Sequence, residues 1–319
     1  MLSLADIRQA TERLTSHLHE VPLLRTPWLE AFVDGPVYCQ TEHLQRSGSF
    51  KIRGALNSLL QLDEAAIARG VVTASAGNHG LGLAHAAQLR GCLAKVFVPK
   101  NVSPAKLVKL RALGAETILA GSDYDEAERA AQAHAHEQRV PFIHAFDDDP
   151  VIAGQGTVGW EILSKSPSVT TVVVPVGGGG LLGGVGMALK ESGSRATVIG
   201  VQSHASPAMQ HAFVQGRVVE TPIGATVADG LAGRFVTPKT LKLAQRYCDG
   251  MLLVTEEQIK RAMRTCYEQQ GWRLEGSAAV GIAALLAGKV DLTGGMAVVI
   301  ISGGNISTEL FHEQIARLI

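Results

Sequence analysis

The chain has 319 residues, of which 46% are hydrophobic, and its 29 basic residues balance 29 acidic ones. This apolar content is enough for a large buried core, and the balanced charge creates no field that would attract a polyanion. Nucleic acid and membrane surfaces are therefore excluded as expected partners. The weakly polar stretch 277–288 is also shorter than the roughly 18 residues that a membrane helix needs.

The N-terminus and the cysteines indicate a cytoplasmic protein. Residues 2–7 have a capped amphipathic helix pattern without the basic and then apolar pattern of a secretion signal. The cysteines form no Cys-x-x-Cys pair and are spread along the chain at Cys39, Cys92, Cys248 and Cys266. Reduced thiols in the cytosol are the expected state.

From about residue 70, short β-branched runs alternate with helical patterns. Strands are expected at residues 71–75, 93–98, 116–119, 142–143, 170–176, 197–202, 251–254 and 296–301. Helices are expected from His79, from Ser103, from Asp123 and over residues 151–164. The alternation predicts an α/β fold with two open parallel-sheet lobes, flanking helices and a ligand between them.

Two segments indicate where the lobes meet. The polar stretch 145–150 and the region before Gly70 are the best candidates for lobe boundaries. They predict a large lobe of residues 1–62 and 148–319 and a small lobe of residues 63–147.

In open parallel sheets ligands collect beyond the carboxyl ends of strands, so the loops after the strands carry the information. The first unusual loop has the sequence Ser75, Ala76, Gly77, Asn78 and His79. Its small residues let a ligand approach free backbone N–H groups at a helix N-terminus, which suits a carboxylate. An ordinary turn capped by Asn78 is the alternative.

Four successive glycines, Gly177, Gly178, Gly179 and Gly180, follow the strand expected at 170–176. Such a run is costly in backbone entropy, and a purely structural turn seldom needs it. A loop that wraps a phosphate does need it. The sequence therefore favours phosphate binding at this loop.

A nicotinamide-dependent oxidoreductase is the competing hypothesis for the same loop. Gly178, Gly180 and Gly183 satisfy the pattern G-x-G-x-x-G of dinucleotide-binding folds. That fold needs an acidic residue for the ribose at the end of the next strand, where this chain has Gln202. The oxidoreductase is therefore the weaker interpretation.

The third loop begins with Ser302, followed by two glycines and Asn305, after the apolar run 297–301. A hydroxyl at this position could hydrogen-bond the edge of a flat aromatic ligand. By itself the segment could equally be a turn.

Lys51 is the candidate nucleophile because it lies between Phe50 and Ile52 rather than among charges. Apolar neighbours and the basic Arg53 favour a lowered pKa, which makes the amine available for imine formation. The serines before Lys51 could instead mark a helix start. One ligand accounts for the lysine and the three loops, because pyridoxal phosphate has an aldehyde, a phosphate, a phenolic oxygen and a ring nitrogen.

These four motifs, in this order, resemble those of the fold-type II pyridoxal-phosphate enzymes, specifically the serine/threonine dehydratase (threonine ammonia-lyase) and serine racemase group. The resemblance runs nearly end to end and implies a tryptophan synthase β-like fold, in which the large lobe binds the cofactor. The residues that it assigns to the cofactor are Phe50, Lys51, Asn78, Gly177, Gly178, Gly179, Gly180, Leu181 and Ser302.

The resemblance also implies their roles. Lys51 holds the cofactor as a Schiff base, Phe50 packs beside the ring, and Asn78 meets the phenolic oxygen. The glycine loop, with Leu181 after it, would hold the phosphate, and Ser302 would meet the pyridine nitrogen. A neutral serine there suits prompt β-elimination rather than a long-lived carbanion.

The implied reaction is a β-elimination. The substrate amine displaces Lys51, the freed lysine removes the Cα proton, and the β-hydroxyl leaves after protonation by the cofactor phosphate. A 2-oxo acid and ammonia are released. The substrate carboxylate would bind the backbone N–H groups of Ser75, Ala76, Gly77, Asn78 and His79.

Departures from the family's patterns distinguish its branches. Eukaryotic-type serine racemases have a serine where this chain has Ala76, and that serine acts as the acid on the opposite face of the substrate. Because Ala76 lacks this group, an amino-acid racemase ranks second, below the dehydratase. Threonine dehydratases carry Ser-Ala-Gly-Asn-His, which matches, whereas His79 and the four glycines disagree with the cysteine synthase branch. The expected substrate is a β-hydroxy amino acid of the L-threonine or L-serine type. A cofactor-binding protein without turnover ranks last.

No metal site is expected. The positions that bind a divalent cation in several relatives correspond to Gln202 and Ala208, neither a good ligand for a hard cation. His134 and His136 lie two residues apart in a helical segment, so they point to different faces and are expected to be solvated.

Several further expectations concern the surroundings of the site and the assembly. Asp229 and Glu275 lie in segments that match the family near the cofactor, although Glu275 could simply cap a helix from Ser277. The stretch 222–235 is a candidate part of the substrate pocket on the grounds of its position and its glycines. Since the chain ends at Ile319, no C-terminal regulatory domain is expected, and the group's habit suggests a homodimer.

Overall fold

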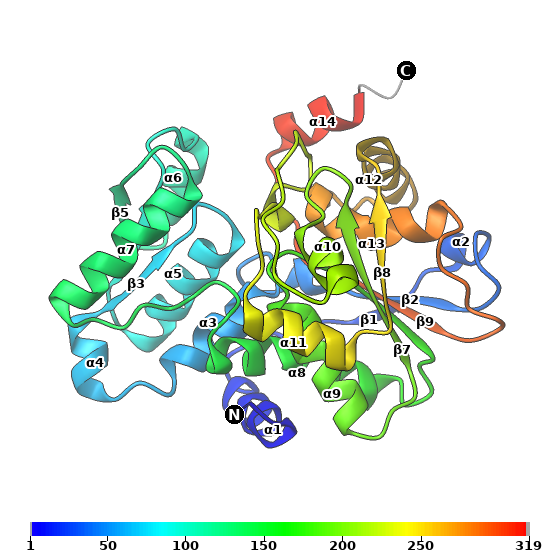
Figure 1. Ribbon diagram of the computed structural model, residues 1–319, viewed down its shortest axis with the longest axis horizontal. Helices are drawn as coiled ribbons and strands as arrows, with labels where there is room; N and C mark the ends of the chain where they lie inside the picture. The colour runs from blue at the N-terminus through cyan, green and yellow to red at the C-terminus, as the bar shows by residue number, and fades with distance from the viewer. Residues whose placement is uncertain (1, 317–319) are drawn as a thin grey trace.

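The computed structural model describes residues 2–316, which form two sheets flanked by helices (Figure 1). The strands of the larger sheet are β1 Leu23–Arg25, β2 Val37–Gln40, β6 Thr171–Pro175, β7 Thr197–Ser203, β8 Gly250–Val254 and β9 Ala297–Ile300. The strands of the smaller sheet are β3 Val71–Ala74, β4 Ala94–Val98 and β5 Glu116–Leu119.

The helices account for most of the remaining chain. They are α1 Leu4–Leu14, α2 Pro27–Glu30, α3 Lys51–Leu59, α4 Glu64–Arg69, α5 Asn78–Arg90, α6 Pro104–Ala112, α7 Tyr124–Gln138, α8 Asp149–Lys165, α9 Gly180–Glu191, α10 Ala208–Gln215, α11 Pro238–Tyr247, α12 Glu256–Gln270, α13 Gly276–Leu286 and α14 Thr308–Ala316, with 3-10 helices η1 Glu42–Leu44 and η2 Asp229–Leu231. None of the helices within residues 2–316 is long and apolar enough to cross a bilayer.

The predicted α/β fold with two parallel-sheet lobes is confirmed. The larger sheet has the order β1-β2-β9-β6-β7-β8 and the smaller one β3-β4-β5. All pairs are parallel except β1 with β2, which adds an antiparallel edge. Neither β1 nor β2 was predicted, because both strands are short. In addition, β2 pairs with β9 at the far end of the sequence, with Val37 opposite Ala297.

The prediction of a strand at 142–143 is wrong. This segment makes a single bridge between Phe142 and Val72 rather than a ladder. Ile143 N donates to Val72 O at 2.8 Å, and the Thr73 hydroxyl donates to Ile143 O at 2.8 Å. The segment is therefore an extended connection along the edge of the small sheet.

The core of the large lobe follows from the alternation of side chains along β6. Val172 and Val174 are fully buried among residues of α8 and α9, whereas Val173 is buried on the other face against α13. A strand covered on both faces is a continuous apolar run, as in other parallel sheets. Figure 1 shows α12 and α13 on one side of this sheet and α8 and α9 on the other.

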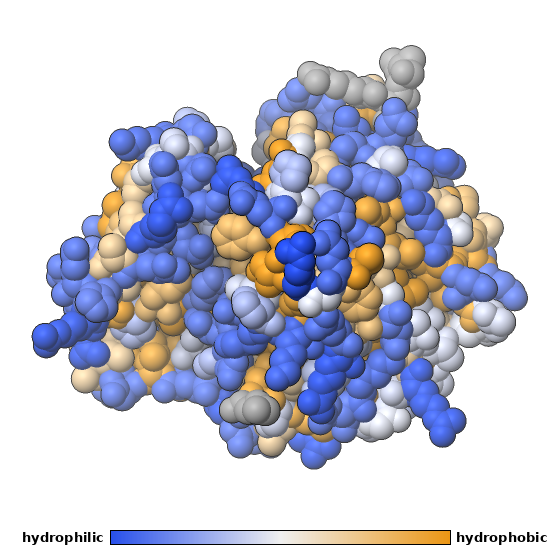
Figure 2. Space-filling model, in the orientation of Figure 1, coloured by the Kyte–Doolittle hydropathy of each residue, from blue (hydrophilic) through white to orange (hydrophobic). Residues whose placement is uncertain are grey.

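Helix α3 joins the two lobes, because it packs on α5 of the small lobe and on α8 of the large lobe. Figure 1 places the small sheet and α4 to α7 together, apart from the large sheet. The surface is hollowed between the two lobes (Figure 2). The lobe limits 1–62 with 148–319 and 63–147 stay a prediction, but the start of α3, and with it Lys51, lies where the lobes meet.

Candidate active site

Lys51 is the first residue of α3, and its partly buried side chain is held by the segment between the lobes. The Lys51 Nζ donates to the carbonyl oxygen of Ala145 at 2.8 Å and lies 5.2 Å from the centre of the Phe50 ring. Burial lowers the pKa of Lys51 to about 8, and the Glu275 carboxylate opposes this shift. The amine is thus partly unprotonated near neutral pH, as a nucleophile requires.

The expected contribution of Arg53 to that shift is wrong. The Arg53 guanidinium donates to both carboxylate oxygens of Glu42 at 2.8 Å and to Glu161 at 2.6 Å. Arg53 and Glu42 are buried, with side chains 4% and 0% exposed. Because its charge is neutralised locally, Arg53 fixes the start of α3 against α8 and does not perturb Lys51.

The lysine segment and the Ser302 loop lie side by side. Phe50 N donates to the carbonyl oxygen of Ser302 at 3.1 Å, and Ser49 forms a bridge with Gly303. Phe50 occupies the N-cap position of α3, so the serines before Lys51 are not its cap. Ser302 is buried, at 3% exposure, and the hydroxyl of Ser49 is buried without a hydrogen-bond partner among the described residues.

Asn78 joins the same cluster through its side chain. It is the first residue of α5, whose N-cap is Gly77, so the interpretation of Asn78 as a cap is wrong. Its Nδ2 donates to Glu275 Oε1 at 2.6 Å, and its Oδ1 accepts from Asn305 Nδ2 at 2.7 Å. The asparagine of one lobe is therefore fixed by two residues of the other.

Glu275 does not cap α13 as the sequence allowed. It holds the N-cap position, but its carboxylate makes no capping hydrogen bond and turns to Asn78 instead. Burial, followed by the charge of Asp229, raises the pKa of Glu275 to about 7. The family match around Glu275 was the one signal in the sequence for this residue.

The glycine loop is positioned at the N-terminus of α9. Within residues 2–316, the amides of Gly178, Gly179 and Gly180 donate to no acceptor. Free amides at a helix N-terminus attract an anion. Packing also requires the glycines, because a Cβ at Gly178 would lie 2.5 Å from the Phe146 ring, and Gly179 has φ +97°. Leu181 packs its side chain into the core.

The predicted substrate loop, Ser75 to His79, lies between β3 and α5. The Ser75 hydroxyl accepts from Gly77 N at 3.2 Å, which shapes the turn, and Ala76 is partly exposed beside it. The His79 ring is buried 3.1 Å from the Ile143 carbonyl oxygen, and burial, helped by the charge of Lys51, lowers its pKa to about 3. His79 is therefore neutral and anchors the loop to the small lobe.

The turn 144–148 is a part of the site that the sequence indicated only as a lobe boundary. His144 Nδ1 accepts from the amides of Phe146 at 3.2 Å and Asp147 at 3.0 Å. This turn presents the Ala145 carbonyl to Lys51 and packs Phe146 against the glycine loop. It therefore links the lysine with the candidate phosphate site.

The structure also places the other segments and residues that the sequence singled out. Segment 222–235 reaches the small lobe, since Lys106 Nζ lies 3.1 Å from Asp229 and Arg234 pairs with Asp125. Gln202 Oε1 accepts from Gln210 N at 2.8 Å, at the start of α10. The solvated role expected of His134 is wrong, because its ring packs 5.4 Å from that of Phe97.

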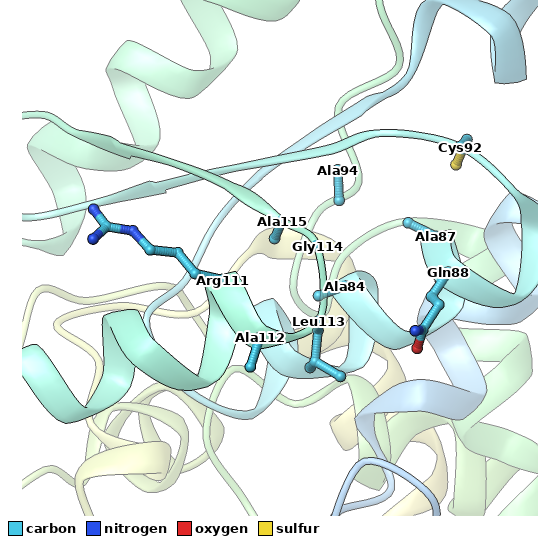
Figure 3. A pocket seen from close by; sticks show the side chains of 10 residues that line it. All are labelled: Ala84, Ala87, Gln88, Cys92, Ala94, Arg111, Ala112, Leu113, Gly114 and Ala115. Carbon is cyan, nitrogen blue, oxygen red and sulfur yellow. The ribbon is translucent and has the colours of Figure 1, made fainter.

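A pocket of about 400 Å³ lies in the small lobe, away from these residues (Figure 3). It is lined by α5, the start of β4 and residues 111–115, and Figure 3 shows mostly small side chains around it. None of its lining residues was predicted to bind the cofactor or the substrate. The chemistry is concentrated between the lobes instead.

The residues between the lobes fit pyridoxal phosphate, the cofactor predicted from the sequence. The Lys51 amine can react with an aldehyde, and the free amides of the glycine loop can hold a phosphate. Asn78 has a second N–H without a described acceptor, and Ser302 lies next to the lysine segment. The four predicted motifs thus converge from distant parts of the chain.

Comparison with known proteins agrees with this site. The family model described as pyridoxal-phosphate dependent enzyme matches residues 14–303. The L-threonine ammonia-lyase of Thermotoga maritima is 42% identical over 317 residues, which cover 99% of this chain and 79% of that protein.

Solved structures superpose over nearly the whole chain. The processed form of threonine deaminase isoform 2 from Solanum lycopersicum gives a TM-score of 0.92 at 34% identity, covering 98% of this chain and 86% of that one. Maize serine racemase gives a TM-score of 0.93 at 29% identity, covering 99% and 97%. Because the family model and the relatives match almost end to end, the chain belongs to the pyridoxal-phosphate dependent enzyme family.

Proposed function

We propose that this enzyme is an ammonia-lyase, or dehydratase, for a β-hydroxy amino acid of the L-threonine or L-serine type. It would release a 2-oxo acid and ammonia by β-elimination. The observation that carries the proposal is the partly buried Lys51 amine, with its pKa lowered to about 8, next to the Ala145 turn and the Ser302 loop. The names of the Thermotoga maritima and Solanum lycopersicum relatives support it.

The cofactor contacts are part of the proposal. Lys51 would anchor pyridoxal phosphate, Phe50 would pack beside its ring, and Asn78 would donate to its phenolic oxygen. The phosphate would bind the backbone of Gly177, Gly178, Gly179, Gly180 and Leu181, and Ser302 would meet the ring nitrogen. When bound, the cofactor supplies an electron sink for the bond that breaks at the substrate Cα.

The protein's own groups would then orient the substrate and move its protons. The backbone N–H groups of Ser75, Ala76, Gly77, Asn78 and His79 would bind the carboxylate at the N-terminus of α5. Lys51 Nζ would take the Cα proton, because its lowered pKa leaves much of the amine unprotonated near pH 8. The partly buried turn 144–148 would limit the access of water to this amine.

Racemisation is the second candidate because maize serine racemase superposes closely. It needs an acid on the face of the substrate opposite Lys51. Ala76, the residue at the second position of the substrate loop, has no hydroxyl to serve as this acid. We therefore expect elimination to dominate over racemisation.

A panel of substrates tests the function. The purified protein would be assayed with L- and D-serine, L-threonine, L-allo-threonine, 3-hydroxyaspartate and phenylserine, following 2-oxo acid, ammonia and the enantiomer of each substrate. Equal amounts of 2-oxo acid and ammonia from L-threonine or L-serine are expected. Formation of the opposite enantiomer without ammonia would instead identify a racemase.

The pH dependence of cofactor binding tests the state of Lys51. The rate at which pyridoxal phosphate recombines with the cofactor-free protein should rise with pH and level off above about 8. Only the unprotonated amine attacks the aldehyde, and its fraction stops growing once the pH passes the pKa. A rate that keeps rising toward 10.5, the ordinary pKa of lysine, would show that burial does not tune this amine.

Assembly and location extend the proposal. We expect a cytoplasmic homodimer with lobes over residues 1–62 with 148–319 and 63–147. Size-exclusion chromatography with light scattering would measure the mass in solution against the 33.6 kDa of one chain. A mass of one chain at micromolar concentration would contradict the dimer.

A further inference from the structure

Glu275 closes a hydrogen-bond chain that sets the orientation of the Asn78 amide. The chain begins at the carbonyl oxygen of Ser47, which accepts from Asn305 Nδ2 at 2.8 Å. The same Nδ2 donates to Asn78 Oδ1 at 2.7 Å, and Asn78 Nδ2 donates to Glu275 Oε1 at 2.6 Å. The four residues come from four separate segments of the sequence.

The acceptors at the two ends of this series of hydrogen bonds determine which group donates at each step. A backbone carbonyl can only accept, so Asn305 must turn its N–H groups toward Ser47, and an ionised carboxylate can also only accept. Both N–H groups of Asn305 are then used, and Asn78 must present its oxygen to Asn305 and its nitrogen to Glu275. One Asn78 N–H is left over for a ligand.

Close packing holds Glu275 in this arrangement. Glu275 is 8% exposed, and a Cβ on Gly303 would lie 2.6 Å from its Oε1 and 3.1 Å from Asn78 Nδ2. The position after Ser302 must therefore be glycine to admit the pair. The carboxylate also precedes α13 without capping it, so the fold of that helix does not account for its orientation.

We propose that Glu275 is a positioning residue for the cofactor: it fixes the Asn78 amide so that the remaining N–H points at the bound pyridoxal phosphate. This inference rests on the proposed function, in which Asn78 donates to the phenolic oxygen. Glu275 does not itself touch the cofactor. Without the Glu275 carboxylate the Asn78 amide is free to rotate. Cofactor binding must then bear the entropic cost of ordering this amide, which the folded protein otherwise holds in place beforehand.

A double-mutant cycle between Glu275 and Asn78 tests the coupling. The variants E275A, N78A and the double variant would be compared at pH 8, above the pKa of Glu275 of about 7. The measurements are the dissociation constant of pyridoxal phosphate and the wavelength of its visible absorption band. Each single variant is expected to weaken binding by roughly three- to tenfold, the range of one hydrogen bond, and to shift the band.

The double variant should bind pyridoxal phosphate no more than about twofold more weakly than the weaker-binding single variant. This is because both substitutions remove the same interaction. A matched control is N57A, which removes another buried asparagine whose partners are Arg13 and Pro150. Its effect should multiply with that of E275A. Multiplying effects of E275A and N78A would overturn the coupling.

The conservative variant E275Q separates position from charge. A glutamine oxygen can accept the same hydrogen bond, so E275Q should keep cofactor affinity and absorption within about twofold of the wild type. E275Q as impaired as E275A would overturn the positioning role. If E275A fails to fold, as judged by its unfolding transition without cofactor, N305A releases the same chain from its other end and must weaken cofactor binding.

The outcomes also separate this inference from the proposed function. If N78A leaves cofactor affinity and absorption unchanged, Asn78 is not a cofactor contact, and the proposed site fails together with the inference. If N78A impairs both and E275A impairs neither, the site stands and the role of Glu275 is wrong.

Discussion

Lys51→Ala is expected to lower ammonia release by roughly 10²–10⁴-fold or more, the range for removal of a general acid–base group. The alanine also lacks the amine that would anchor the cofactor, and no other lysine among the described residues donates to Ala145. Ammonia and 2-oxo acid would be followed together with the visible absorption of the bound cofactor. Both activity and the wild-type absorption band should disappear.

Lys289→Ala is the matched control. Lys289 is an exposed lysine whose Nζ donates to a backbone carbonyl, that of Leu253, at 2.7 Å, much as Lys51 donates to Ala145. Its removal should leave activity and absorption as in the wild type. Retention of both by the Lys51 variant would show that another residue performs the chemistry.

Arg53→Ala is expected to destabilise the protein by roughly 3–5 kcal/mol, the range for breaking a buried ion pair. The change leaves Glu42, which is fully buried, without the guanidinium that neutralises it. It also removes the link from α3 to Glu161 of α8. Chemical denaturation of the cofactor-free protein, followed by circular dichroism, would measure the free energy of unfolding.

Arg25→Ala provides the comparison for this effect. The Arg25 side chain is 59% exposed and pairs with Glu30 at 2.9 Å. Water already screens this pair, so its loss should change the free energy of unfolding little. Equal effects of the two arginine variants would mean that burial adds nothing to the Arg53 pair.

Much of the fold could be predicted because its signals are local. The run that became β6 is β-branched and apolar on both faces, and the helix that follows begins within a loop of glycines. The same locality identified Lys51, the Asn78 loop and the Ser302 loop, since each follows a strand or begins a helix. That these segments meet at one site was predicted from the order of the motifs and from the family resemblance.

The contacts that complete the site were outside the reach of such signals. Asn78 and Glu275 are 197 residues apart, and Lys51 and Ala145 are 94 apart, yet each pair forms a hydrogen bond. Strand β2 likewise depends on β9 at the far end of the chain.

Residue types and short-range periodicity state what each segment can form and which chemistry it carries, because propensity and capping act over a few residues. Partners brought together by packing leave no such local trace. The neutralisation of Arg53, the raised pKa of Glu275 and the orientation of Asn78 therefore depend on the folded arrangement of the two lobes, where burial and distance set the strength of each charge and hydrogen bond.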